Sequence, residues 1–240
     1  MKYSDIVNQI KESPILLIGI GNELQIKETL IGAESFTIEY ARKVYQMIKK
    51  EEQEQLRDYT EAYGVIKKMT AGKDYFIVTT NTDGMLESMG FDADRIVSPC
   101  GSIFRMQCEE QDHGVWDIKE MLLRQNEIKC PVCQKAGKIN VIKNKPYNES
   151  GYMKQWEIYT RWLQRTINRK IMLLELGEGF ETPTVIRWPF EKIAYINQKS
   201  LFVRVNRTYP QLAEEMKERA CSVKEDSISF LRQISELLNK

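Results

Sequence analysis

Apolar and polar residues follow one another in blocks that predict short strands separated by helices. The apolar runs have the composition of buried strands, and they cover residues 15–22, 75–79, 96–97, 170–177 and 200–206. Apolar residues recur at helical spacing in the segments between them, at residues 1–13, 31–69, 152–169 and 226–238. Strands that alternate with helices favour a parallel sheet with helices on both faces.

The pattern therefore predicts an α/β fold, a Rossmann-like doubly wound parallel sheet with a small zinc-binding module inserted. Residues 1–97 and 152–240 are assigned to the Rossmann-like domain. Residues 98–151 change character, with short β-like pieces and most of the cysteines, and are assigned to the small module. Residues 24–71 are expected to form a helical segment over the cleft.

Two helices are predicted in more detail. The helix over 152–169 is expected to carry Trp156, Tyr159, Trp162, Leu163 and Ile167 on one face. We expect its three aromatic residues in the core. The last helix is expected to begin at a cap formed by Asp226 or Ser227.

Charge and hydropathy narrow the choice of partners. The 240 residues include 35 basic and 34 acidic side chains without a long run of one sign, so we expect neither nucleic acid nor a membrane as partner. The longest apolar runs, 15–18 and 171–174, are too short to span a bilayer. Residues 1–14 lack the apolar core of a signal peptide, so a soluble cytoplasmic protein is expected.

Five cysteines and one histidine are present in the chain. An odd number of cysteines with one tight C-x-x-C pair favours metal binding over a disulfide framework. The predicted zinc ligands are Cys108, Cys130, Cys133 and, as a possible fourth, His113. The alternative is a module with unligated thiols, held together by its apolar residues Phe104, Val115, Trp116 and Leu122. Cys221 lies in a polar stretch that we expect to be helical, as a spare thiol.

Small or polar residues follow each predicted strand, at the edge where doubly wound sheets bind their ligands. These residues are Gly19, Gly21, Asn22, Thr80, Asn81, Asp83, Cys100, Gly177, Glu178, Gly179 and Asn206. The glycine pairs let the backbone approach a pyrophosphate, although such pairs also make simple turns. Glu178 could accept a hydrogen bond from a ribose hydroxyl or a backbone amide, while its charge would oppose a phosphate.

At these strand ends the sequence resembles the sirtuins. Residues 75–108 are similar to the sirtuin strand that leads into T-Q-N-x-D, followed by H-G-S-x-F and the first zinc cysteine. The matching positions are Thr79, Asn81, Asp83, Gly101, Ser102, Phe104 and Cys108. The run from Gly177 to Glu191 looks most like the sirtuins of bacterial pathogens that are linked to macrodomains and act as ADP-ribosyltransferases.

The resemblance implies NAD as cofactor. It places Asn81 and Asp83 beside the nicotinamide ribose, the glycine loops at the pyrophosphate and Asn206 at the adenosine. A carboxamide needs both a donor and an acceptor, which an asparagine or a backbone amide supplies. Without the family, Asn81-x-Asp83-Gly84 would be read as an ordinary turn.

Cys100 occupies the position of the sirtuin catalytic histidine. A thiol acts as a base only when its pKa falls, so we expect ordinary deacetylation to be weakened or absent. Cys100 is either a small filler, a remodelled base or nucleophile, or a metal ligand. The first function hypothesis is an NAD-dependent ADP-ribosyltransferase, or weak deacylase, that acts on a protein substrate. The second is an inactive relative that binds NAD or ADP-ribose as a sensor, and the third is simple NAD hydrolysis.

Overall fold

Six parallel strands form the central sheet of the protein. The structure is a computed structural model, and it describes residues 2–34, 36–49, 53–110, 112–216 and 218–239. The strands are β1 (Ile15–Ile20), β2 (Asp74–Thr79), β3 (Ile96–Val97), β7 (Ile171–Leu176), β8 (Ser200–Val205) and β9 (Ala220–Val223). Their order in the sheet is β3-β2-β1-β7-β8-β9, and every pairing is parallel. The order reverses between β1 and β7, which confirms the predicted doubly wound Rossmann-like sheet.

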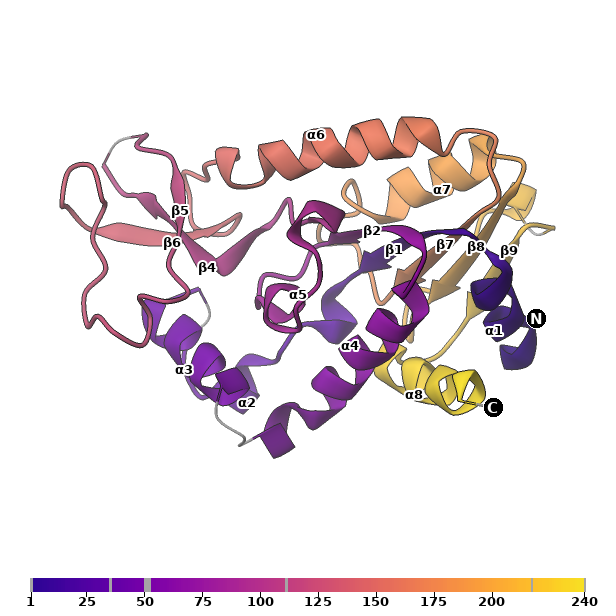
Figure 1. The fold of residues 1–240 in the computed structure, drawn as a ribbon, viewed down its shortest axis with the longest axis horizontal. Coiled ribbons are helices and arrows are strands. Elements are labelled where there is room, and N and C mark those ends of the chain that lie inside the picture. Colours follow the sequence, from indigo (N-terminus) through magenta and orange to yellow (C-terminus); the bar gives the residue numbers. More distant parts are fainter. Residues whose placement is uncertain (1, 35, 50–52, 111, 217, 240) are drawn as a thin grey trace.

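Helices cover both faces of this sheet (Figure 1). α1 (Tyr3–Glu12), α4 (Arg57–Thr70) and α8 (Ser227–Leu238) pack on one face, and α6 (Ser150–Arg165) and α7 (Arg187–Ile196) pack on the other. β1 shows why both faces are covered. Its side chains alternate between the two cores, with Leu16 and Ile18 toward one and Ile15 and Leu17 toward the other. A strand buried on both faces reads as a continuous apolar run, as this one does.

A second, three-stranded antiparallel sheet follows β3 in the chain and lies beside α3 in Figure 1. It consists of β4 (Gly101–Cys108), β5 (Val115–Asp117) and β6 (Gly137–Val141), in the order β5-β4-β6. The remaining helices in the described parts of the chain are α2 (Glu28–Ile31), α3 (Ile38–Lys49), α5 (Met85–Ser88) and short 3₁₀ helices at Asn22–Leu24, Gln53–Leu56, Ala93–Arg95 and Glu214–Met216. Residues of α3 and of β4 share one core cluster with the central sheet.

The helical pattern predicted over residues 31–69 corresponds mainly to two helices, α3 and α4. Residues 35 and 50–52 of that segment lie outside the described residues. α4 packs beside α8 on one face of the sheet, whereas residues 25–29 and Phe36, which precede α3, contribute to the cavity described below.

Two expectations were wrong in detail. Cys221 lies in β9, the edge strand that pairs with β8, and not in a helix. α6 ends at Arg165 rather than at residue 169, so Ile167 stands outside the helix with 61% of its surface exposed. The expectation for the three aromatic residues is confirmed, since Tyr159 and Trp162 are buried and Trp156 is half-buried and packs against the same core cluster.

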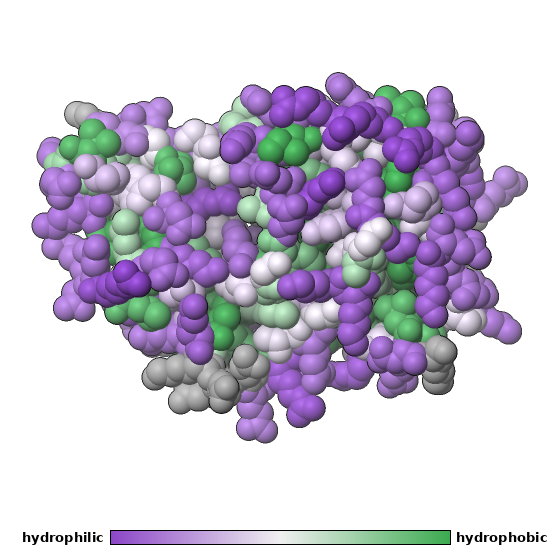
Figure 2. Space-filling model, in the orientation of Figure 1, coloured by the Kyte–Doolittle hydropathy of each residue, from purple (hydrophilic) through white to green (hydrophobic). Residues whose placement is uncertain are grey.

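The cap of the last helix is confirmed. Oδ1 of Asp226 accepts hydrogen bonds from the amides of Ile228 and Ser229, at 3.0 and 3.2 Å. The face of the molecule seen in Figure 2 is mostly hydrophilic, with scattered apolar residues. None of the helices in the described parts of the chain combines the length and the apolar character that crossing a bilayer requires.

Candidate functional site

A cavity of 530 Å³ lies at the carboxyl ends of the central strands, beside the junction of β1 and β7. Polar residues that follow β1, β2, β3 and β7 meet there. The predicted residues that line it are Asn22, Thr80, Asn81, Cys100, Glu178 and Gly179. The sequence pattern did not single out the others, which include Gln25, Lys27, Thr29, Phe36, Thr82, Lys143, Glu181 and Thr182.

The glycines at this junction permit close approach between parts of the protein itself. A Cβ on Gly21 would lie 2.4 Å from Cα of Glu178, and a Cβ on Gly19 would lie 2.4 Å from Cγ2 of Ile186. Gly177 has a φ of 66°, a left-handed conformation that glycine adopts without strain. Gly179 lines the cavity and has more open space around it. The close contact of β1 with β7 thus depends on Gly21.

We expect Gly21→Ala to destabilise the protein by about 1–3 kcal/mol, because the added methyl meets the backbone of Glu178 rather than a flexible side chain. Urea denaturation measures this loss. The matched control is Gly64→Ala in α4, where the new methyl has no neighbour within 4 Å beyond the adjacent residues and the backbone of its own helix. That control should be neutral or stabilise by up to about 1 kcal/mol. Equal effects of the two substitutions would contradict the close-contact explanation.

Asp83 lies behind the cavity and joins the loops that follow β1 and β2. Its side chain is 1% exposed, and its carboxylate oxygens accept hydrogen bonds from the amides of Ile26 at 2.9 Å and Met85 at 3.1 Å. Burial raises the pKa of Asp83 to about 7, although these two amides oppose the shift. The side chain of Asp83 therefore holds the loop at residues 22–26 in place.

Asn81 is presented to the cavity by the turn after β2. Its amide nitrogen lies 3.4 Å from the hydroxyl of Tyr63 in α4, and its backbone amide donates to Thr79 Oγ1 at 3.0 Å. The next residue, Thr82, donates its backbone amide to Gln25 Oε1 at 2.8 Å. These contacts connect the β2 turn to the β1 loop and leave Asn81 at the cavity wall.

Three polar side chains from three different strand ends converge on the cavity. Thr80 Oγ1 donates to Glu178 Oε2 at 2.7 Å, and burial raises the pKa of Glu178 to about 7. Burial likewise raises the pKa of the Cys100 thiol to about 11, with Glu178 and Glu181 adding to the shift. At neutral pH Cys100 is consequently a thiol, and the titrating group of this trio is Glu178.

Asn206 supports the β7 loop from behind. Its Nδ2 donates to the carbonyl of Glu178 at 2.8 Å, while its Oδ1 accepts from the amides of Thr208 and Tyr209 at 2.9 and 2.6 Å. The side chain of Asn206 thus makes all three of these hydrogen bonds to backbone groups of the protein. Asn206 thereby connects the loop after β8 to the loop after β7.

A buried ion network lies beneath the same loop. Arg204 in β8 donates to both carboxylate oxygens of Glu175 in β7, at 2.7 and 2.8 Å, and to Glu191 in α7 at 2.7 Å. Arg187 lies 3.6 Å from Glu175 and donates twice to the carbonyl of Tyr209 at 3.1 Å. Arg204 and Glu175 are fully buried. The network joins β7, β8 and α7 below the loop at residues 177–182.

The four predicted metal ligands come together in the small sheet region. The candidate ligand atoms of Cys108, His113, Cys130 and Cys133 all lie within 4.8 Å of one another. Cys108 Sγ lies 3.6 Å from Cys133 Sγ, and His113 Nδ1 lies 3.3 Å from Cys130 Sγ. A tetrahedral zinc ion with normal bond lengths separates two such ligand atoms by about 3.6–3.8 Å. The Cys108–Cys133 distance matches that separation, whereas the distance between His113 Nδ1 and Cys130 Sγ is slightly shorter.

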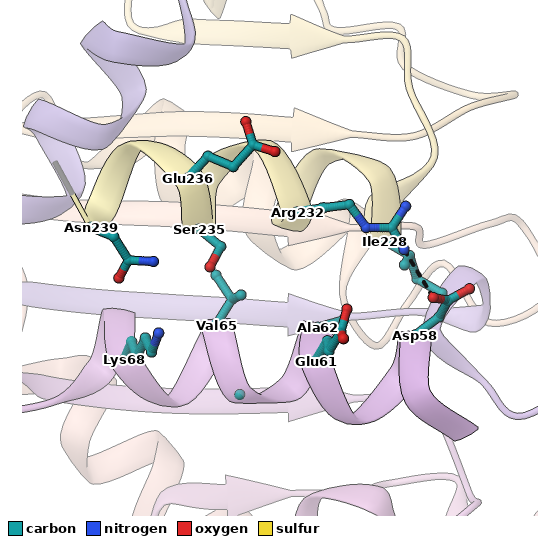
Figure 3. Close-up of a pocket in the computed structure, with 11 residues that line it drawn as sticks. Asp58, Glu61, Ala62, Val65, Lys68, Ile228, Arg232, Ser235, Glu236 and Asn239 are labelled. Carbon is teal, nitrogen blue, oxygen red and sulfur yellow. Dashed lines mark hydrogen bonds and ion pairs between the residues drawn. The ribbon is translucent and has the colours of Figure 1, made fainter. Parts of the chain in front are cut away.

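A groove between α4 and α8 offers 380 Å³ on the outer side of the molecule (Figure 3). Arg232 at its mouth pairs with Asp58 at 2.9 Å, and both side chains are largely exposed. Its residues come from helix surfaces and not from strand ends. The cavity at the β1–β7 junction is therefore the better candidate for the functional site.

Sequence reasoning missed Gln25, Tyr63 and the network around Arg204. Tyr63 falls at a helical position that reads as core, and Gln25 belongs to a loop without periodicity. Arg204 is the one charged residue of the apolar run at 200–206, and Glu175 lies inside the run at 170–177, whose first residue is Lys170. A charge inside a predicted buried strand signals a paired partner, so this network could have been anticipated.

The comparisons with known proteins agree on the fold. No family model matches the chain. A protein ADP-ribosyltransferase of Staphylococcus aureus is 23% identical over 181 residues, which cover 69% of this chain and 58% of that protein. A probable bifunctional ADP-ribose hydrolase/ADP-ribosyltransferase of Fusarium oxysporum f. sp. cubense is 26% identical over 144 residues, which cover 51% of this chain and 24% of that protein. The chain thus matches only part of the length of each of these relatives.

Solved structures of Sir2 enzymes align with nearly the whole chain. One from a study of Sir2 mechanism and regulation has a TM-score of 0.59 at 13% identity, covering 99% of this chain and 97% of that chain. Sir2Tm bound to a propionylated peptide has a TM-score of 0.58 at 14% identity, covering 98% of each chain. The protein has the fold of these Sir2 enzymes, at a sequence identity of 13–14%.

Proposed function

We propose that the protein binds NAD in the cavity at the β1–β7 junction, cleaves the nicotinamide–ribose bond and transfers ADP-ribose to another protein. The observation that carries this proposal is the convergence of Asn22, Thr80, Asn81 and Glu178 on one cavity at the carboxyl edge of a Sir2-type sheet. The names of the two relatives, which both include ADP-ribosyltransferase, support the reaction class.

The residues present fit a dinucleotide. The cavity volume of 530 Å³ is typical of a ligand site, for which about 300–1,000 Å³ is usual. Three glutamates, Glu28, Glu178 and Glu181, line it together with Lys27 and Lys143, and these two lysines supply the cationic groups that would pair with phosphates. Asn22 and Asn81 offer both donors and acceptors for hydroxyl and carboxamide groups. Asp83 and Asn206 would contribute indirectly, by holding the loops that carry the cavity residues. NAD would supply the nicotinamide–ribose bond that is broken.

Cys100 argues for transfer of ADP-ribose over deacylation. The thiol occupies the position of the sirtuin histidine, and burial raises its pKa to about 11. A group with that pKa removes a proton poorly at neutral pH. We therefore propose that any deacylase activity of this protein is weak.

The same observation favours a second candidate function. A chain in which the histidine position holds a protonated thiol could bind NAD or ADP-ribose without turnover, as a sensor. This candidate predicts binding of NAD with no release of nicotinamide. The first candidate predicts both binding of NAD and release of nicotinamide.

Nicotinamide release separates the two. We expect the purified protein to release nicotinamide from NAD, and Asn81→Ala to slow the release by about 10- to 100-fold, through the loss of one hydrogen bond of about 1.5–3 kcal/mol. Chromatography of the products measures the rate, and calorimetry measures binding. Asn239→Ala at the exposed end of α8 is the matched control. Tight binding of NAD without release of nicotinamide would contradict the transferase and support the sensor. Absence of both NAD binding and nicotinamide release would contradict both candidate functions.

We also propose that Cys108, His113, Cys130 and Cys133 hold a structural zinc ion. The four ligand atoms lie within 4.8 Å of one another, and three thiolates with one imidazole are a common structural zinc set. The ion would connect β4 to the turn that precedes β6. It would not contact the cavity, because none of the four residues lines it.

A further inference from the structure

The cavity contains a buried carboxylate for which the sirtuin resemblance provides no role. Of the described acidic residues that line the cavity, Glu178 is 2% exposed, whereas Glu28 and Glu181 are exposed. Burying a carboxylate is costly unless its interactions offset the loss of water. A buried acid that faces a ligand cavity is for this reason a candidate for acid–base chemistry.

The backbone around Glu178 is held on three sides. Asn206 Nδ2 donates to its carbonyl at 2.8 Å, and Arg187 Nη1 approaches the same carbonyl at 3.5 Å. Gly21 packs so closely against Cα and N of Glu178 that no side chain fits between them. With its backbone fixed in this way, the side chain reaches toward β2, where Thr80 Oγ1 donates to Oε2 at 2.7 Å.

We propose that Glu178 is the proton acceptor of the transfer reaction, with Thr80 as the residue that positions its carboxylate. This inference rests on the proposed function. Thr80 precedes Asn81, the residue expected at the nicotinamide ribose, and Cys100 lies on the same cavity. Glu178 thus shares one cavity with the residue expected at the ribose, whereas the Cys100 thiol stays protonated at neutral pH and cannot accept a proton.

The step balances without a further reactant. The acceptor group X–H of the protein substrate attacks C1′ of the nicotinamide-bearing ribose, so the X–C1′ bond forms while the C1′–N bond breaks. The electron pair of that bond leaves with nicotinamide. The proton of X–H passes to the carboxylate of Glu178 and then to water.

Burial and the charges around Glu178 determine its pKa, and therefore the pH range in which its carboxylate can accept this proton. Glu175 in β7 and Glu181 in its own loop raise its pKa, Arg187 in α7 and the Thr80 hydroxyl lower it, and burial is the largest influence. The resulting pKa of about 7 matches a general base that works at neutral pH. Only the ionised form accepts a proton, so the rate should rise with pH through 7.

The experiment compares nicotinamide release between pH 5.5 and 9 for wild type, Glu178→Gln and Thr80→Val. We expect Glu178→Gln to lower the rate by about 10²- to 10⁴-fold and to abolish the rise with pH. Thr80→Val removes a hydrogen bond to the ionised carboxylate, so its rise should move to higher pH. Glu157→Gln, an exposed acid on α6, is the matched control and should behave as wild type.

A second measurement does not depend on activity. The ¹³C carboxyl resonance of Glu178 in the ligand-free protein, assigned by its absence in Glu178→Gln, should titrate near pH 7 and at higher pH in Thr80→Val. A resonance that titrates near pH 4.5 would overturn the assignment. So would an active wild type whose rate and pH profile are shared by Glu178→Gln. If wild type binds NAD but releases no nicotinamide at any pH, the proposed function itself fails and this role fails with it.

Discussion

Arg204→Met is expected to lower the free energy of unfolding by about 3–5 kcal/mol, because the buried Glu175 carboxylate loses both of its hydrogen bonds to Arg204 and keeps only Arg187, at 3.6 Å. Arg204 donates to both oxygens of Glu175, and both side chains are fully buried between β7, β8 and α7. The substitution also removes the donor to the carbonyl of Gln211, at 2.6 Å. Urea denaturation followed by circular dichroism measures the loss.

Two further variants test the cause of this loss. Arg232→Met breaks the exposed pair with Asp58, for which we expect a change below about 1 kcal/mol. The double variant Glu175→Met with Arg204→Met removes this buried ion pair and leaves Arg187 with its hydrogen bonds to the carbonyl of Tyr209, so it should recover much of the lost stability. If the double variant is no more stable than Arg204→Met alone, the uncompensated charge is not the cause. The loop at residues 177–182 lies on this network, so we expect Arg204→Met to weaken NAD binding as well.

Purified protein is expected to contain about one zinc ion per chain, and Cys130→Ser to lose it. Structural zinc sites contribute about 10–16 kcal/mol of apparent binding free energy in small domains, so removal of the ion should lower the melting temperature measurably. Phe104, Ile118 and Leu122 are buried beside the same strands, so the small sheet should loosen around the cysteines rather than unfold altogether. Elemental analysis gives the zinc content, and thermal melts with and without a chelator give the stability.

Cys221→Ser is the matched control for zinc, since this thiol lies in β9 at the edge of the central sheet. It should leave the zinc content unchanged. A zinc content far below one ion per chain in protein prepared with added zinc would favour the alternative, a module with unligated thiols. Retention of zinc by Cys130→Ser would contradict the ligand set.

The strands could be predicted because strands that are buried on both faces consist almost entirely of apolar residues. β1, β2, β7 and β8 are apolar runs, and they were all expected. β9 was missed because it is an edge strand of four residues whose Ser222 is exposed, so it has no apolar run to detect. Without an apolar run, the polar stretch around Cys221 was assigned to a helix.

The candidate site was predicted in its parts but not in its arrangement. Residues at the ends of parallel strands share one edge of the sheet, so the strand pattern alone was enough to group Asn22, Thr80, Asn81, Cys100 and Glu178. Their individual contacts depend on side-chain directions and on loop geometry. Local sequence does not specify these.

The sequence by itself determined the strand and helix pattern, the doubly wound sheet and the positions of the polar strand ends, because hydrophobic periodicity and turn residues act locally. It also placed two metal-ligand cysteines in one short C-x-x-C turn. Only the tertiary structure decided which groups meet. It turned Asp83 away from the cavity toward two backbone amides, and it placed Glu178 on Thr80, 98 residues away in the chain. Such pairings depend on how strands far apart in sequence pack together, and burial in that packing changes the chemistry of each carboxylate.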